Sequence, residues 1–131
     1  MPNLDKVIYP ELSYALGGIF FKVHNELGRS CKENQYCDAI EKLLKERKLN
    51  YKRELCIKSN KELIRDNSDR IDFIVEDKIV IEVKAKRIIG REEYNQIKRY
   101  LSSLDLKLGL LVNFHQNYLT PKRILNAKVK E

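Results

Sequence analysis

Cysteine, histidine and long apolar runs are scarce in this sequence, and each scarcity argues against a class of protein. The three cysteines, Cys31, Cys37 and Cys56, are an odd number without a Cys-x-x-Cys pair, which argues against a disulfide framework, a structural zinc site and an iron–sulfur cluster. The two histidines, His24 and His115, have no partner at ligand spacing, so no Ser/His or Cys/His dyad is predicted. No apolar run approaches the ~20 residues that span a bilayer, so no membrane span is expected.

The amino terminus also lacks the basic segment followed by an apolar one that marks a secretory signal. Together with the cysteine count, this predicts a cytoplasmic protein. With 131 residues, 43% of them hydrophobic, the chain is long enough for one domain with a packed core, which we assign to residues 1–131. No internal repeat or linker divides it.

Positive charge is in excess and unevenly placed. The net charge is +7, yet residues 1–83 carry 15 Lys and Arg against 15 Asp and Glu, while residues 84–131 carry 11 against 4. Lys84, Lys86, Arg87 and Arg91 crowd together where the basic part begins. Cations beside an acidic cluster suit an enzyme that acts on a polyanion, although a solubilising lysine-rich surface explains each of these residues alone equally well.

Two β-branched runs, residues 70–75 and 79–85, flank a short charged interruption and predict an antiparallel hairpin. Asp72, Glu82 and Lys84 interrupt these apolar strands, and burying such groups is costly unless they are paired or hold a metal. Asp72 shares a face with the other two only if the numbers of paired residues add up to an even sum, for instance with Asp72 opposite Glu82. That register requires a three-residue connection over 76–78, with Asp77 in a left-handed conformation.

Helical spacing of apolar residues predicts helices over 10–27, from about 31 to 47, and over 92–104. Strands are predicted over 50–58 and 107–114, with a short edge strand over 122–125 and a loop over 59–69. A helix between strands 79–85 and 107–114 makes a crossover unit, so these two strands should be parallel. The order ααβββαβ predicts an α/β domain with a mixed β-sheet flanked by helices.

Glu33 lies at the amino-terminal end of the apolar stripe of the second helix, one turn ahead of Cys37. An acid at this position also favours the helix dipole by itself. Glu33 becomes a candidate ligand only because Asp72 and Glu82 need a third partner.

With these elements placed, the sequence resembles the PD-(D/E)XK nuclease superfamily, and most of all its small GxxExxY proteins (PD-(D/E)XK superfamily 3), from about residue 20 to 125. The QxxxY motif of RecB-like nucleases is matched as well. One departure is Ser30, where that branch has the glycine of its naming motif, although Gly28 precedes it by two residues. The residues that carry the resemblance are Glu33 and Tyr36 (ExxY), Asp72, Glu82 and Lys84 ((D/E)xK), and Gln96 and Tyr100 (QxxxY).

The resemblance implies a restriction-endonuclease-like core and a metal-dependent phosphodiester hydrolase that acts on nucleic acid, with DNA the first expectation. Glu33, Asp72 and Glu82 would hold Mg²⁺ or Mn²⁺, which prefer oxygen ligands. Lys84 would orient the attacking water or meet the phosphate. Because the fold has no separate recognition domain, a homodimer or an accessory protein is a further expectation.

Supporting roles follow from the same resemblance. Gln96 counts as catalytic and, with Tyr100, would position Lys84 or the substrate, while Tyr36 would support the site. Taken alone, Gln96 reads as a solvent-facing helix residue. The nucleic-acid-binding candidates are Lys86, Arg87 and Arg91, together with the amides at the start of the third helix.

Two alternatives remain open. One is a nucleic-acid-binding or partner-binding module without turnover, and the other is a structural protein in which Lys84 forms buried salt bridges with Asp72 and Glu82. A single lysine against three acids leaves surplus negative charge unless a cation joins them, which favours the enzyme.

Overall fold

The computed structural model describes residues 8–56 and 70–128, and the predicted loop over 59–69 lies outside them. The predicted order of helices and strands is confirmed, although the second helix begins at Glu33, slightly later than predicted. The elements are α1 (Pro10–Leu27), α2 (Glu33–Glu46), β1 (Tyr51–Cys56), β2 (Arg70–Val75), β3 (Ile79–Lys84), α3 (Arg91–Leu104), β4 (Leu108–Asn113) and β5 (Lys122–Leu125).

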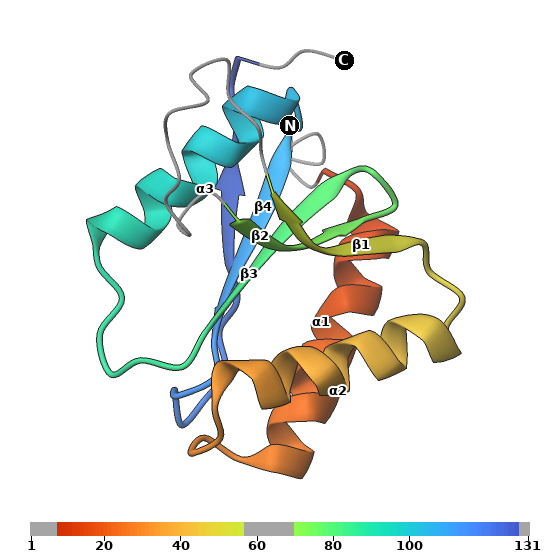
Figure 1. The fold of residues 1–131 in the computed structure, drawn as a ribbon, viewed down its shortest axis with the longest axis vertical. Coiled ribbons are helices and arrows are strands. Elements are labelled where there is room, and N and C mark those ends of the chain that lie inside the picture. Colours follow the sequence, from red (N-terminus) through yellow and green to blue (C-terminus); the bar gives the residue numbers. More distant parts are fainter. Residues whose placement is uncertain (1–7, 57–69, 129–131) are drawn as a thin grey trace, which may run out of the picture.

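The five strands form one sheet in the order β1-β2-β3-β4-β5. Only β3 and β4 pair in parallel, joined through α3 as the crossover pattern predicted, and the other neighbours are antiparallel. Figure 1 shows α1 and α2 on one side of the sheet and α3 on the other. All six residues of β4 are buried, because this strand is covered on both faces. None of the described helices combines the length and apolar character that a bilayer crossing needs.

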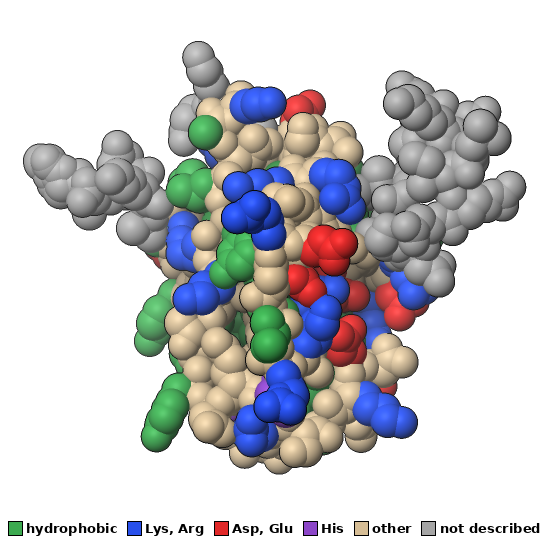
Figure 2. Space-filling model, turned by 90° about the vertical axis from the view of Figure 1, so that its left-hand side faces the viewer, with side chains coloured by type: hydrophobic (Ala, Val, Ile, Leu, Met, Phe, Trp, Pro, Cys, Tyr) green, Lys and Arg blue, Asp and Glu red, His purple; other side chains and the backbone are tan. Residues whose placement is uncertain are grey.

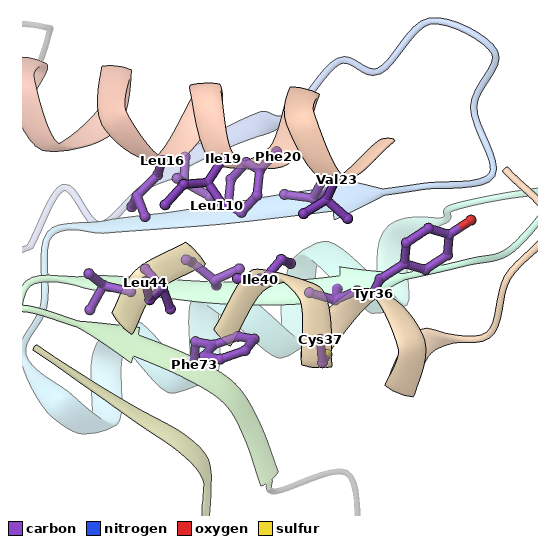
Figure 3. Packing of buried hydrophobic residues seen from close by; sticks show 14 of the residues in the cluster. Leu16, Ile19, Phe20, Val23, Tyr36, Cys37, Ile40, Leu44, Phe73 and Leu110 are labelled. Atoms are coloured by element: carbon purple, nitrogen blue, oxygen red, sulfur yellow. The ribbon is translucent and has the colours of Figure 1, made fainter. Parts of the chain in front are cut away.

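The larger core lies between the sheet and the two N-terminal helices. Figure 3 shows Phe20 of α1 beside Leu110 of β4, and Ile40 and Leu44 of α2 over the strands near Phe73. These side chains recur every three or four residues along each helix, so each helix buries one stripe. This packing fixes α2 above β2, where the predicted site begins.

The β2–β3 hairpin has the predicted connection. Val75 pairs with Ile79, which leaves residues 76–78 as a three-residue connection closed by a 3.0 Å hydrogen bond from Lys78 N–H to the Val75 carbonyl. Glu76 and Asp77 both have left-handed backbones, with φ of 54° and 53°. Glu76 and Asp77 are the two residues between the ends of this hydrogen bond, and positive φ at both matches the twist of the two strands. The turn therefore sets the register.

Candidate metal centre

The main-chain ladder between β2 and β3 ends where the two acids begin. Its last pair is Phe73 with Ile81, so Asp72 and Glu82 come next in register. At this point side-chain carboxylates replace main-chain carbonyls as hydrogen-bond acceptors. Asp72 N–H donates to Glu82 Oε1 at 3.0 Å, and Val83 N–H donates to Asp72 Oδ2 at 2.7 Å. Each carboxylate therefore accepts a backbone N–H from the other strand, and the two acids are adjacent as the register argument predicted.

The other neighbour of β2 is also irregular at this point. Glu54 of β1 lies opposite Asp72 and has a left-handed backbone with φ of 58°, which costs roughly 1–3 kcal/mol for a residue other than glycine. Phe73 joins the larger core, whereas Ile71 packs with the smaller core under α3. Residues two apart on a regular strand face the same side, so β2 switches faces at Asp72. This switch accompanies a carboxylate that reaches across to β3.

Burial favours the protonated form of both carboxyl groups. Glu82 is only 2% exposed, and burial, reinforced by the charge of Asp72, raises its pKa to about 8 despite the opposing Asp72 N–H and Lys84. Burial also raises the pKa of Asp72, with a smaller upward contribution from Glu33, against the Val83 N–H and Lys84. The positive groups around these two acids are too weak to cancel the effect of burial on their pKa values.

Lys84 supplies only part of that charge. Its Nζ lies 3.9 Å from Glu82 Oε2, which is a loose ion pair rather than a short hydrogen bond, and 19% of its side chain is exposed. Its carbonyl accepts the N–H of Phe114 at 2.8 Å, so the backbone of Lys84 is fixed against the end of β4. One ammonium group can balance only one of the two carboxylates, so the other is protonated, as the raised pKa of Glu82 favours, or needs a further cation.

Glu33 is near the pair but exposed. It is the first residue of α2, and its charge contributes to the raised pKa of both Asp72 and Glu82. Across the described residues, no group of three Asp, Glu, His or Cys side chains lies close enough to hold one metal ion. The structure therefore brings Asp72, Glu82 and Lys84 together and leaves the three-acid ligand set a prediction.

Tyr36 fixes the loop that leads to Glu33. Its hydroxyl donates to the Gly28 carbonyl at 2.6 Å and accepts the Cys31 N–H at 3.1 Å, while its ring stacks on Phe114 with centroids 4.4 Å apart. Gly28 has φ of 76°, which favours glycine. The tyrosine of the ExxY segment thus bonds directly to the glycine that ends α1.

Tyr100 acts on the start of β2. Its hydroxyl donates to the Arg70 carbonyl at 3.1 Å, two residues ahead of Asp72, and the ring is buried in the smaller core. Gln96 lies one turn earlier on α3 and is half-buried rather than fully solvent-facing. The positioning of Lys84 by these two residues remains a prediction.

The predicted nucleic-acid-binding residues differ in their surroundings. Lys86 Nζ lies 2.6 Å from Glu93 Oε2, and the other oxygen of Glu93 accepts the Gly90 N–H at 2.7 Å. This ion pair, foremost among the causes, lowers the pKa of Glu93 to about 2. The amino terminus of α3, a candidate phosphate site from sequence, thus already has a carboxylate of its own. Arg87 and Arg91 are exposed.

Asn113 is a supporting residue that the sequence prediction missed. It is buried at the end of β4, opposite Lys84, where its Oδ1 accepts the Lys86 N–H at 3.1 Å and its Nδ2 donates to the Lys86 carbonyl at 2.8 Å. Its Oδ1 also accepts the N–H of His115 at 3.2 Å. A polar residue closing an unbroken apolar run was the available signal. Asn113 joins the two loops that leave the sheet beside Lys84.

Acidic and basic side chains gather in different places on the side of the molecule that carries the β3–α3 connection. Figure 2 shows acidic side chains gathered near the middle of this side, with Lys and Arg side chains above and below them. A polyanion that approaches this side could therefore meet cations above and below its exposed acidic side chains.

Comparison with known proteins agrees with this architecture. A family model described as the PD-(D/E)XK nuclease superfamily matches residues 10–124, from the start of α1 into β5. Neither the curated proteins nor the solved structures give a match. Two N-terminal helices and a mixed five-strand sheet with one inserted helix are consistent with the predicted restriction-endonuclease-like core. On this match, the chain belongs to the PD-(D/E)XK nuclease superfamily.

Proposed function

We propose that this protein is a metal-dependent nuclease that hydrolyses phosphodiester bonds in DNA. The observation that carries the proposal is the pairing of two buried carboxylates, Asp72 and Glu82, on adjacent strands beside Lys84. Besides Lys84, which pairs only loosely with Glu82, a proton on Glu82 balances the pair in the absence of metal, and a divalent cation would take the place of that proton.

Within the superfamily, we assign the chain to the GxxExxY branch. Tyr36 supports this assignment, because its hydroxyl bonds to the backbone of Gly28 and of Cys31 in the loop that leads to Glu33. Ser30 departs from the branch pattern, but Gly28 supplies a glycine that contacts the motif tyrosine.

The donor set suits Mg²⁺ or Mn²⁺. Both candidate ligands are carboxylates, the oxygen donors that such hard ions prefer. One oxygen of each accepts a backbone N–H, while Oδ1 of Asp72 and Oε2 of Glu82 take no part in those bonds. Glu33 at the start of α2 would join as the third acid, directly or through water. A divalent cation would also favour the charged form of both carboxylates and so oppose the burial that raises their pKa values.

The other roles in phosphodiester hydrolysis are assigned to individual side chains and to the bound ion. When bound, the ion would lower the pKa of a water and neutralise charge that develops on the phosphoryl group. Asp72 and Glu82 hold their oxygens in place because each is tied to the other strand. The ammonium group of Lys84 orients the attacking water or contacts the scissile phosphate. Arg87 and Arg91 attract the DNA backbone.

A binding module without turnover is the second candidate. It is favoured by the exposed position of Glu33, which does not form a three-ligand group with the pair among the described residues.

A cleavage assay separates the two candidates. Wild type, Asp72→Asn and Glu82→Gln would be incubated with single-stranded, duplex and branched DNA and with RNA, in Mg²⁺, in Mn²⁺ and in EDTA. We expect metal-dependent cleavage of DNA by wild type and its loss in both variants. Asp105→Asn is the matched control, because Asp105 is an exposed α3 cap whose left-handed backbone suits asparagine. Metal-dependent cleavage that survives both site substitutions would contradict the proposal.

A further inference from the structure

Two loops beside Lys84 each present one exposed apolar side chain. They are residues 85–90, which follow β3, and residues 114–121, which follow β4. Because β3 and β4 are parallel and Lys84 pairs with Asn113, both loops leave the same end of the sheet, as Figure 1 shows. Ile88 is 78% exposed and Tyr118 is 89% exposed.

The loop that carries Tyr118 is anchored on both sides of it. Arg29 donates from Nε to the His115 carbonyl at 2.8 Å, and His24 Nε2 bonds to the Gln116 carbonyl at 2.8 Å. On the other side Leu119 is buried in the larger core. Within the described part of the chain, the ring of Tyr118 makes no aromatic or cation–π contact. A fixed backbone thus holds this ring in solvent.

The loop that carries Ile88 is built in the same way. Asn113 bonds to both the N–H and the carbonyl of Lys86, and Glu93 accepts the Gly90 N–H. Ile89 packs against the smaller core under α3. Each loop therefore has anchored backbone on both sides of its exposed residue and an apolar neighbour that packs against a core, fully buried for Leu119 and partly buried for Ile89.

This arrangement suits contacts to bases rather than to phosphates. Single exposed apolar residues are common on protein surfaces, but here the anchored backbone means that binding would not have to order the loops. Aromatic rings stack on unpaired bases, and apolar side chains can pack on base faces that are already exposed without the cost of a few kcal/mol that unstacking a duplex step requires. A continuous duplex keeps its internal base faces stacked and offers such side chains little.

We propose that Tyr118 stacks on a nucleobase, with Ile88 packing against another base of the same substrate, so that the substrate is DNA with unpaired bases: a single strand or the open arms of a branched duplex. The choice of DNA rests on the proposed function. The base contacts themselves involve neither carboxylate of the metal centre.

Fluorescence tests the stacking directly. Because the sequence contains no tryptophan, Tyr118→Trp introduces a single indole at the proposed contact. Titration in EDTA with oligothymidine, a forked duplex and a blunt duplex should quench this indole with the first two and leave it nearly unchanged with the third. Tyr14→Trp is the matched control, since Tyr14 lies on α1 and is 86% exposed, and no oligonucleotide should quench it.

Affinity gives the second measurement, by anisotropy of labelled oligonucleotides in EDTA. Tyr118→Ala should weaken binding of oligothymidine and the fork by roughly 5- to 150-fold, the effect of one base–aromatic stack, while Tyr118→Phe retains binding. Blunt-duplex binding should not change. An equal loss on duplex and single strand, unquenched indole, or no binding of any oligonucleotide by wild type would overturn the proposal. Because no metal is present, failure of the cleavage assay and failure of stacking are separate results.

Discussion

Removing the charge of Glu82 should stabilise the metal-free protein, although most substitutions at buried positions destabilise. Glu82→Gln keeps the shape of the side chain and an oxygen that can accept the Asp72 N–H. It removes the negative charge that burial and Asp72 make unfavourable. The net effect on stability follows from the raised pKa of Glu82.

The substitution increases the free energy of unfolding because it removes the cost of burying a charged carboxylate. With its pKa raised to about 8 in the folded protein, Glu82 lowers the free energy of unfolding at pH 7 by about 3 kcal/mol relative to a carboxyl group with the ordinary value. The raised pKa already includes the opposing effects of Lys84 and of the Asp72 N–H, so these are not subtracted a second time. We therefore expect a net gain of up to about 3 kcal/mol.

Urea unfolding in EDTA measures this gain. A raised carboxyl pKa destabilises the fold above the ordinary value, so the difference between Glu82→Gln and wild type should be present at pH 7 and shrink toward zero near pH 4, where the group is protonated in both states. Glu46→Gln, an exposed acid at the end of α2, is the control and should change stability by less than about 0.5 kcal/mol. A Glu82→Gln protein clearly less stable than wild type at pH 7 would refute the reasoning.

Three further predictions concern residues that support the site. Tyr36→Phe keeps the stacked ring but removes two hydrogen bonds, so thermal unfolding should show a loss of about 1–3 kcal/mol. Glu93→Gln should lower the melting temperature at pH 7 and matter less as the pH falls from about 4.5 toward 2, because Lys86 holds the pKa of Glu93 low and its contribution is lost on protonation. Gly109→Ala should destabilise by about 1–3 kcal/mol in urea, because its Cβ would lie 2.5 Å from Ile97 Cγ2.

Each of these has a matched control in the same chain. Tyr14→Phe removes an exposed hydroxyl and should leave the melting temperature unchanged. Glu92→Gln alters an exposed acid beside Glu93 and should lack the same pH dependence. Gly17→Ala lies in α1 with no atom within 4 Å of the new Cβ, so it should stabilise rather than destabilise, by about 0.5–1 kcal/mol. Equal effects in a variant and its control would contradict the corresponding assignment.

The hairpin could be predicted in detail because its signals are local. Strand side chains alternate with period two, so placing Asp72 and Glu82 on one side required an odd number of turn residues, and the charged triplet at 76–78 supplied it. The parallel pairing of β3 with β4 followed in the same way from the length of the connection.

The irregular backbone at the acids could not be predicted. Glutamate rarely adopts a left-handed conformation, so nothing at Glu54 signals φ of 58° within a strand. The switch of faces between Ile71 and Phe73 depends on packing against both layers rather than on local pattern. Sequence spacing thus located Asp72, but not the way its carboxylate bonds to the next strand.

Tertiary structure gives one residue of the predicted basic surface a partner that the sequence did not indicate. Lys86, grouped with Arg87 and Arg91, forms an ion pair with Glu93 across the β3–α3 loop, and its contact with nucleic acid stays a prediction. The ion pair depends on how the loop closes onto α3, which composition alone does not specify. Asn113 was missed for the same reason, since its partners come from another loop.

The central claim is that Asp72 and Glu82 together hold one divalent cation, and calorimetric titration with Mn²⁺ tests it most directly. Wild type should show saturable binding of one ion, Asp72→Asn and Glu82→Gln should each lose it, and the exposed-acid control Glu46→Gln should bind like wild type. Absence of binding in wild type, or binding unchanged in both site variants, would contradict the account.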